Sequence, residues 1–286
     1  MISDITLGQF FPGKSAIHKL DPRTKIILAT LFIVAVFLAN NPISFAFLLI
    51  VTVALILISK ISVKVILMSI KPIVFIILFT AIINIFVTKG EGAPLLSWWV
   101  IEIYTEGIAR AVMMAMRVIL LIVGTSILLT YTTSPISLTD GLESLLSPLK
   151  VIKLPVHTFA MMMSIALRFI PTLIEETEKI MNAQKSRGAD FTSGNLIERG
   201  KALIPILVPL FVSSFKRAEE LATAMECRCY RGDYNRTKLV KLEYKGIDYG
   251  FIFIFVLILG VLVCSTVLPY KLDSFGIIYD IIFYKV

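Results

Sequence analysis

Two arginine-containing segments are the part of this 286-residue sequence whose side chains could do chemistry on a partner. The first segment ends in Ser186-Arg187-Gly188, and the second ends in Cys227-Arg228-Cys229, with Arg231-Gly232 close behind. A guanidinium is the side chain that best forms bidentate hydrogen bonds with a carboxylate. The repeated pattern therefore predicts two arginines that bind acidic groups on a partner.

An arginine near a helix end also has a simpler explanation. Followed by glycine, as in Arg187-Gly188, it is an ordinary C-terminal stop signal that complements the helix dipole. That explanation does not account for the same ending on two helices of one segment. We therefore expect two adjacent helix ends that present guanidinium groups, and we keep the plain helix cap as the alternative.

Each arginine is expected at the end of a long helix that is apolar early and acidic in its middle. The apolar parts, residues 154–167 and 202–215, hold 14 residues each, whereas a bilayer-spanning helix needs about 20. Pro205 and Pro209 are expected to break the second run. These segments therefore suit buried or surface-lying helices better than membrane spans.

Uncharged stretches elsewhere predict a membrane protein. Hydrophobic residues make up 57% of the chain and charged residues only 17%, against about 25% charged in an ordinary soluble domain. We expect five spans: two within residues 26–59, on either side of the turn signal Asn40-Asn41-Pro42, and one each in 65–88, 107–130 and 249–270. Residues 89–106 are expected to form an interfacial loop with an aromatic belt.

The placement of Lys and Arg predicts the orientation in the membrane. A net charge of +8 could suggest nucleic acid, but in a membrane protein such an excess marks cytoplasmic loops, so no nucleic-acid partner is expected. The predicted division is an N-terminal segment with four spans (1–133), a cytoplasmic domain (134–248), and a last span with an external tail (249–286). The sequence thus predicts an all-α, multi-pass protein of the cytoplasmic membrane.

Several function classes are excluded by residues that the sequence lacks. Three cysteines and two histidines are too few for a disulfide framework or a Cys/His metal cluster, so no metal site is expected. Residues 8–14 match the bare Gly-x-x-x-x-Gly-Lys pattern. A phosphate loop must join a strand to a helix, and no strand is expected in an all-α protein, so the chain is not expected to be an ATPase itself. No region combines a nucleophile, a base and an orienting group, so no catalytic residues are expected.

A self-sufficient secondary transporter or channel is the alternative function. Such proteins normally carry ionisable residues inside the bilayer for coupling or selectivity. The five predicted spans contain no Asp or Glu, and Lys71, Arg110 and Arg117 are expected toward span ends. This alternative is therefore less favoured than a subunit that works with partners.

Several segments resemble the transmembrane T component of energy-coupling factor (ECF) importers, the EcfT or CbiQ family. Before the first span, Leu20-Asp21-Pro22-Arg23 resembles the amino-terminal signature of that family. In the insertion, the segments similar to the family's coupling helices are 167–171, 183–191, 217–222 and 224–232. The family's two Ala-Arg-Gly motifs map onto Ser186-Arg187-Gly188 and Cys227-Arg228-Cys229, in which small residues replace the flanking positions.

The resemblance implies a function and a set of partners. The chain would be the non-catalytic coupling subunit of an importer, linking ATP hydrolysis by two ABC-type ATPase subunits to movement of a substrate-binding S component. ATP and Mg would be bound by the ATPases, and no cofactor by this chain. Uptake of a vitamin or a metal ion would follow, with Arg231 and Gly232 as possible additional coupling residues.

The S component is expected to dock on the apolar faces of the two coupling helices. These faces are too apolar for solvent and belong to runs too short to span a membrane. The residues that we expect at the docking surface are Met162, Leu207, Leu221 and Met225.

Overall fold

The computed structural model describes residues 10–88, 96–98, 101–152, 155–189, 191, 195–232 and 242–267. It divides into two compact units, which are described one at a time below. The membrane unit comprises Gln9–Ser134 and Leu242–Val286, and the coupling unit comprises Pro135–Lys241 with Met1–Gly8. The predicted boundaries at residues 134 and 249 assign segments to the two sides of a membrane. That assignment stays a prediction.

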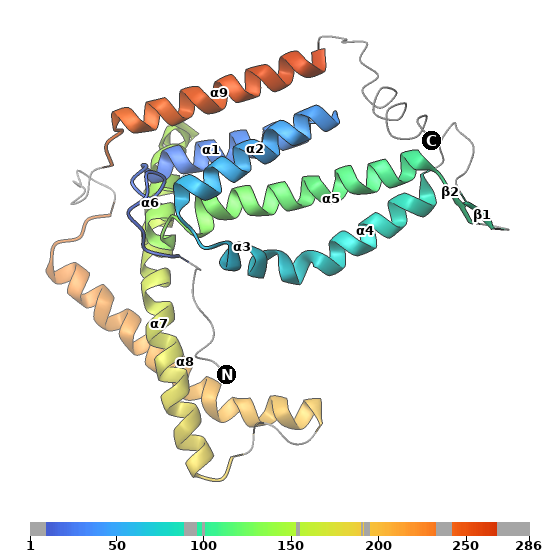
Figure 1. Cartoon of the computed structure of the whole chain (residues 1–286). Helices are drawn as coiled ribbons and strands as arrows, with labels where there is room; N and C mark the ends of the chain where they lie inside the picture. Colours follow the sequence, from blue (N-terminus) through green and yellow to red (C-terminus); the bar gives the residue numbers. More distant parts are fainter. Residues whose placement is uncertain are drawn as a thin grey trace. The chain divides into compact units, whose positions relative to one another are not determined.

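The membrane unit is built from long helices that lie side by side (Figure 1). Its elements are α1 (Pro22–Leu38), α2 (Pro42–Ser59), α3 (Val63–Ile70), the 3₁₀ turn η1 (Lys71–Ile73), α4 (Val74–Val87), β1 (Leu96–Trp98), β2 (Ile101–Ile103), α5 (Thr105–Thr125), the π-helical turn η2 (Ser126–Thr130) and α9 (Gly246–Val267). The all-α membrane class is thereby confirmed.

The first two helices form the predicted hairpin. The Asp21 carboxylate accepts a hydrogen bond from the Arg23 backbone N–H at 2.9 Å and caps α1. Pro22 and Pro42 stand in the first helical turn, where proline's missing N–H costs nothing. The turn at Asn40 and Asn41 therefore separates two helices, as the sequence predicts.

The third predicted span is broken where Pro72 follows Lys71. Proline cannot donate the helical hydrogen bond and disturbs the preceding turn, so α3 ends at Ile70 and α4 begins at Val74. Figure 1 shows the change of direction between the two helices.

The predicted interfacial loop between α4 and α5 contains a short hairpin. Leu96 pairs with Ile103, and Trp98 pairs with Ile101, in a short antiparallel hairpin. β-branched and aromatic residues favour such pairing. The remaining residues of 89–100 lie outside the described part of the chain.

Close packing of α1 against α5 forms the centre of the membrane unit. Phe32 and Leu28 of α1, with Leu120 and Ile127 from the α5–η2 segment, are at most 1% exposed. A Cβ on Gly124 would lie 2.1 Å from Cε1 of Phe32. Only glycine therefore lets the two helices approach this closely, as small residues do between membrane helices.

Arg117 lies midway along the apolar segment Thr105–Thr130, so the expectation that it stands toward a span end is wrong. Its guanidinium donates to the Ala39 carbonyl at 2.7 Å and lies 5.4 Å from the ring centroid of Phe45. Ala39 follows the last residue of α1, whose terminal carbonyls lack helical partners. Arg117 thus caps α1, which is a structural role that needs no transported ion.

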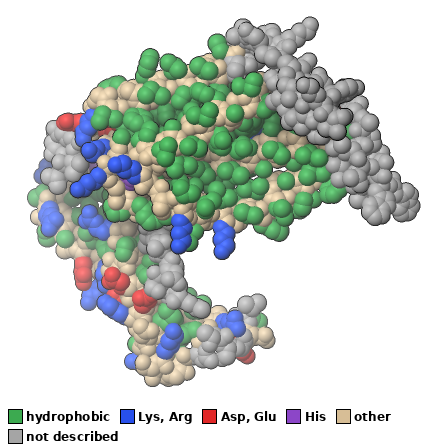
Figure 2. Space-filling model, viewed as in Figure 1, with side chains coloured by type: hydrophobic (Ala, Val, Ile, Leu, Met, Phe, Trp, Pro, Cys, Tyr) green, Lys and Arg blue, Asp and Glu red, His purple; other side chains and the backbone are tan. Residues whose placement is uncertain are grey.

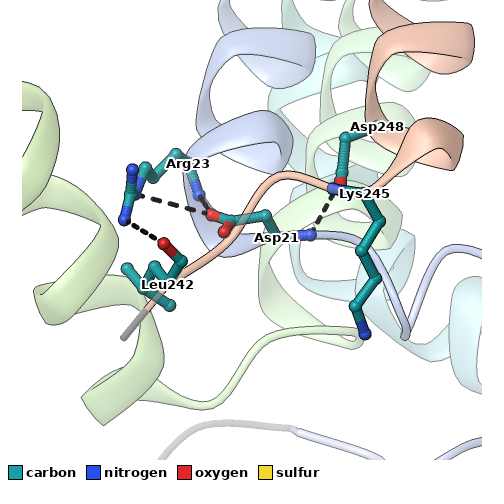
Figure 3. A network of polar contacts seen from close by, with 5 residues as sticks. All are labelled: Asp21, Arg23, Leu242, Lys245 and Asp248. Carbon is teal, nitrogen blue, oxygen red and sulfur yellow. Dashed lines mark hydrogen bonds and ion pairs between the residues drawn. The ribbon is translucent and has the colours of Figure 1, made fainter. Parts of the chain in front are cut away.

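A polar network joins the starts of α1 and α9 (Figure 3). The buried Asp248 carboxylate accepts from the Asp21 N–H at 2.9 Å and from the Lys245 N–H at 2.7 Å. Arg23 donates to the Leu242 carbonyl at 3.0 Å. The network therefore joins two helices that are far apart in the sequence. Leaving these buried polar groups unpaired would cost free energy.

The coupling unit contains α6 (Pro135–Leu146), the 3₁₀ turn η3 (Ser147–Ile152), α7 (Val156–Ser186) and α8 (Leu196–Cys227). His157 at the start of α7 lies 2.8 Å from the Glu143 carboxylate of α6, which ties these helices together. Pro205 and Pro209 lie inside α8, so the expectation that they break this segment is wrong. Figure 1 shows that α8 bends but continues, as helices kinked at proline do.

Five described helical segments are long and apolar enough to cross a membrane: Pro42–Ser59, Val63–Val87, Thr105–Thr130, Val156–Ser186 and Gly246–Cys264. Four of them correspond to the second to fifth predicted spans. The other is α7, whereas α1 has only 17 residues. Figure 2 shows a broad hydrophobic face over the membrane unit, with Lys and Arg gathered toward the end where α1 and α9 begin.

Candidate functional site

The two coupling helices cross each other (Figure 1). Glu176 of α7 accepts a hydrogen bond from the Arg217 guanidinium of α8 at 2.7 Å. Gln184, near the end of α7, reaches the carbonyl of Pro205, near the start of α8, at 3.4 Å. The helices therefore run in opposing directions at their contact.

An apolar groove of about 290 Å³ lies along this crossing. Ala218 and Ala222 are small enough to let α7 approach α8 closely. The other residues that line the groove are Ile165, Phe169, Leu173, Ser214, Arg217, Leu221 and Met225. The crossing thus combines apolar packing with one ion pair at its edge.

The end of α7 is a Schellman motif with Arg187 as the capping residue. The Ala189 N–H donates to the Gln184 carbonyl at 3.0 Å, and the Gly188 N–H donates to the Lys185 carbonyl at 3.0 Å. Gly188 adopts φ of +88°, the left-handed conformation that this motif needs after the cap. The backbone therefore fixes where the Arg187 side chain leaves the helix.

The end of α8 has the same hydrogen bonds, with Arg228 as the capping residue. The Tyr230 N–H donates to the Met225 carbonyl at 3.0 Å, and the Cys229 N–H donates to the Glu226 carbonyl at 2.8 Å. Cys229 adopts φ of +57° and occupies the position of Gly188. Ser186-Arg187-Gly188 and Cys227-Arg228-Cys229 are thus equivalent in backbone structure as well as in sequence.

Both capping arginines are exposed, as are the flanking Ser186, Cys227 and Cys229. Within the described part of the chain, neither the Arg187 nor the Arg228 guanidinium has a hydrogen bond or ion pair. Such side chains remain available for a partner. Their exposure does not by itself distinguish a binding role from a helix cap.

Arg231 differs from the two capping arginines. It lies four residues after Cys227, the last residue of α8, is exposed, and precedes Gly232, which has φ of +75°. Arg231 therefore has no equivalent in the Schellman motif at the end of α7. Its participation in coupling stays a prediction.

The two arginines are not at adjacent helix ends, contrary to the expectation from the sequence. Each follows the residue of its helix in the Glu176–Arg217 contact by 11 positions, which is about 16 Å of helix. Because the helices cross there, their C-terminal ends point away from each other (Figure 1). The structure thus presents two separate arginines.

The residues expected at the docking surface fall into two groups. Met162 and Leu207 are 54% and 58% exposed, and Leu207 belongs to a row of exposed apolar side chains on α8 that includes Leu203, Val208, Phe211 and Phe215. Leu221 and Met225 instead line the groove between the helices and are partly covered. Only the first group is more than half exposed.

The Glu176–Arg217 pair is the contact at this site that sequence reasoning missed. Arg217 lies in one of the segments that resemble the family's coupling helices, whereas Glu176 lies in none of them. A pairing between two helices leaves no periodic signal along either one. The available signal for this pairing was that one helix is acidic in its middle and the other carries a basic residue.

Two comparisons relate this sequence to known proteins. A family model described as CbiQ, cobalt transport protein, matches residues 13–239. A protein from Clostridium kluyveri named energy-coupling factor transporter transmembrane protein EcfT is 53% identical over 94% of this chain and 97% of its own length. The chain belongs to the EcfT/CbiQ family. Its resemblance to that family is thereby confirmed.

Two further EcfT proteins show the same level of similarity to this family member. The one from Ruminiclostridium cellulolyticum is 55% identical over 87% of this chain and 92% of its own length. The one from Bacillus subtilis is 49% identical over 87% of this chain and 93% of its own length. This EcfT/CbiQ family member is therefore a multi-pass transmembrane component of an ECF transporter.

Proposed function

We propose that this EcfT/CbiQ family member is the coupling subunit of an ECF importer. It links ATP hydrolysis by two ABC-type ATPase subunits to movement of a substrate-binding S component, for uptake of a vitamin or a metal ion. The observation that supports this best is the pair of equivalent Schellman ends, each with an exposed arginine as the cap. The chain is non-catalytic in this proposal, and ATP and Mg are bound by the ATPases.

Separate arginines suit two separate ATPase subunits. Arg187 enters a cleft on one subunit and Arg228 a cleft on the other, where each guanidinium pairs with a carboxylate. A bidentate pair is directional. The hydrogen bonds of the Schellman motif restrict movement of each arginine backbone relative to its helix. Closure of the ATPase pair on ATP then moves both helix ends.

The crossing of α7 and α8 transmits that movement from the arginine ends to the exposed apolar residues of α8. Displacing either arginine turns its helix about the Glu176–Arg217 contact and the groove beside it. Small residues at the crossing allow such sliding without opening a cavity. The exposed apolar row on α8 is carried along and moves the S component docked there.

The arginines are tested by alanine substitution in the full chain expressed with both ATPases and the S component. Arg187→Ala or Arg228→Ala is expected to cost about 2 to 5 kcal/mol at a desolvated pair, which is a factor of about 30 or more in affinity. The double variant should abolish assembly. Lysine at either position should rescue only partly, because it keeps the charge but lacks the planar fork.

Arg199→Ala is the matched control for these variants. Arg199 is exposed near the start of α8, so it removes the same charge from the same helix without touching an end motif. Arg231→Ala shows whether that residue contributes. Normal assembly and uptake by the Arg187→Ala, Arg228→Ala double variant would leave both residues as helix caps and disprove the proposal.

The docking proposal is tested at the exposed apolar residues. Met162→Gln and Leu207→Gln are expected to weaken retention of the S component while ATPase binding persists. Leu221→Gln is the comparison, because Leu221 lines the groove between the helices and should disturb the helix pair itself. Unchanged S-component retention in the Met162→Gln, Leu207→Gln variant would contradict docking on these faces.

A further inference from the structure

Helix α3 is held to the membrane unit along one side only. Ile66 is buried, and the Ser69 hydroxyl is hydrogen-bonded to the hydroxyl of Tyr131. On the other side, Leu67 and Met68 are each 61% exposed. The helix therefore presents an open apolar face next to a membrane span.

A groove of about 550 Å³ runs along this open face. Its apolar wall is formed by Val63, Leu67, Met68, Ile70 and Val74. Among the described residues that line it, Lys64 and Lys71 carry the charges. They stand seven positions apart, which is two helical turns and about 10.5 Å. One ammonium group thus stands toward each end of an apolar groove.

Neither lysine is neutralised within the described part of the chain. Both are exposed, and no carboxylate among the described residues forms an ion pair with either one. Each flexible lysine stem can lie along apolar surface while its ammonium reaches the water interface. The groove therefore combines positive charge with an acyl-chain-like lining.

We propose that this groove binds an anionic glycerophospholipid. One acyl chain lies along Leu67 and Met68, and the Lys64 and Lys71 ammonium groups attract the anionic headgroup from the two ends of the groove. Basic residues beside a membrane helix attract anionic headgroups. The break at Pro72 supports this binding, because it lets α3 change direction relative to α4 (Figure 1).

Charge complementarity favours a lipid over a protein at this groove. An apolar partner protein would have to bury both ammonium groups, which is costly without paired carboxylates. A lipid instead keeps its headgroup at the interface, where the lysines remain hydrated. The proposal does not depend on the coupling function of Arg187 and Arg228.

Photo-crosslinking of the full chain in phosphatidylcholine nanodiscs tests the site. A photoreactive phosphatidylglycerol should label residues 63–74 more strongly than photoreactive phosphatidylcholine carrying the same chain. Since one lysine contributes about 1 kcal/mol to attraction of anionic lipid, Lys64→Gln or Lys71→Gln should each lower phosphatidylglycerol labelling about fivefold. Leu67→Gln should lower labelling while leaving both charges.

Lys60→Gln is the matched control, because Lys60 is exposed just before α3 and does not line the groove. It should leave labelling of 63–74 unchanged, and excess inorganic phosphate should not compete. Equal labelling by both lipids, or an equal loss in Lys60→Gln, would reduce the effect to general surface charge and overturn the proposal. Loss of labelling in native membranes that hold the assembled transporter would show instead that a protein covers the groove.

Discussion

At the residue scale, the two coupling helices depend on a single left-handed residue after each arginine. Gly188 adopts this conformation at φ of +88°, and Cys229 does so at +57°. A residue with a Cβ pays about 1 to 2 kcal/mol there. The end of α8 is therefore less stable than that of α7, which would make the Arg228 end easier to reorganise on binding.

Gly188→Ala is expected to destabilise the last turn of α7 by about 1 kcal/mol or more, because alanine disfavours positive φ. No atom of the described residues lies within 4 Å of an added Cβ at Gly188, so the expected cost is conformational and not steric. Amide hydrogen exchange of residues 184–189 should accelerate about fivefold or more.

Gly200→Ala is the control for this prediction, since a Cβ there also meets open space. Gly200 lies inside α8, where alanine is favoured by up to about 1 kcal/mol, so exchange near it should slow. Equal effects of the two substitutions would show that the conformation of Gly188 is not what stabilises the end of α7.

At the element scale, the position of α1 against α5 depends on one missing side chain. Gly124 faces the buried Phe32 ring at a distance that leaves no room for a methyl group. Two helical turns earlier in α5, Arg117 caps the end of α1. Steric fit and a hydrogen bond therefore set the register of the same helix pair.

Gly124→Ala is expected to lower the free energy of unfolding by about 1 to 3 kcal/mol, the usual cost of overpacking a core. Thermal unfolding of the full chain in detergent measures it. Adding Phe32→Leu should recover part of the loss by making space. Gly260→Ala in α9, where an added Cβ meets no described atom within 4 Å, should be neutral or slightly stabilising. A loss similar to that of Gly124→Ala would rule out the Phe32 contact as the cause.

At the scale of the whole molecule, the topology depends on whether α7 lies in or beside the membrane. Its segment Val156–Ser186 is long and apolar enough to cross, but its mean hydropathy of 1.4 is well below the 2.4 to 2.6 of the other four segments. The Lys and Arg of the coupling unit also resist translocation. We therefore expect both ends of α7 on the cytoplasmic side.

Labelling of single cysteines from either side of the membrane tests this topology, in a background lacking Cys227, Cys229 and Cys264. Ser186→Cys should react only from the cytoplasmic side. Lys285→Cys, which lies outside the described residues, should react only from outside, because five spans place the two chain ends on opposite sides. Reaction of Ser186→Cys from outside would show that α7 crosses the membrane.

The sequence alone determined the helical segments and the residues that end them. Hydrophobic runs, proline positions and the Arg-Gly signal act over a few neighbouring residues, so they could be recognised before any fold was known. The hairpin at Asn40 and the two arginine-ended helices followed from such local preferences. The Schellman ends differ only in using Cys229 where α7 has Gly188.

Tertiary structure alone decided how these parts meet. The helix crossing at the Glu176–Arg217 pair separates the ends that carry Arg187 and Arg228. Arg117 caps the end of α1. The Asp248 carboxylate accepts a hydrogen bond from the Asp21 N–H, 227 positions away in the sequence. Pro205 lies within a continuous but bent helix (Figure 1), and its carbonyl accepts a hydrogen bond from Gln184 of α7. Each of these outcomes depends on contacts between residues distant in sequence, whose energies match or exceed local preferences but leave no periodic trace along the chain.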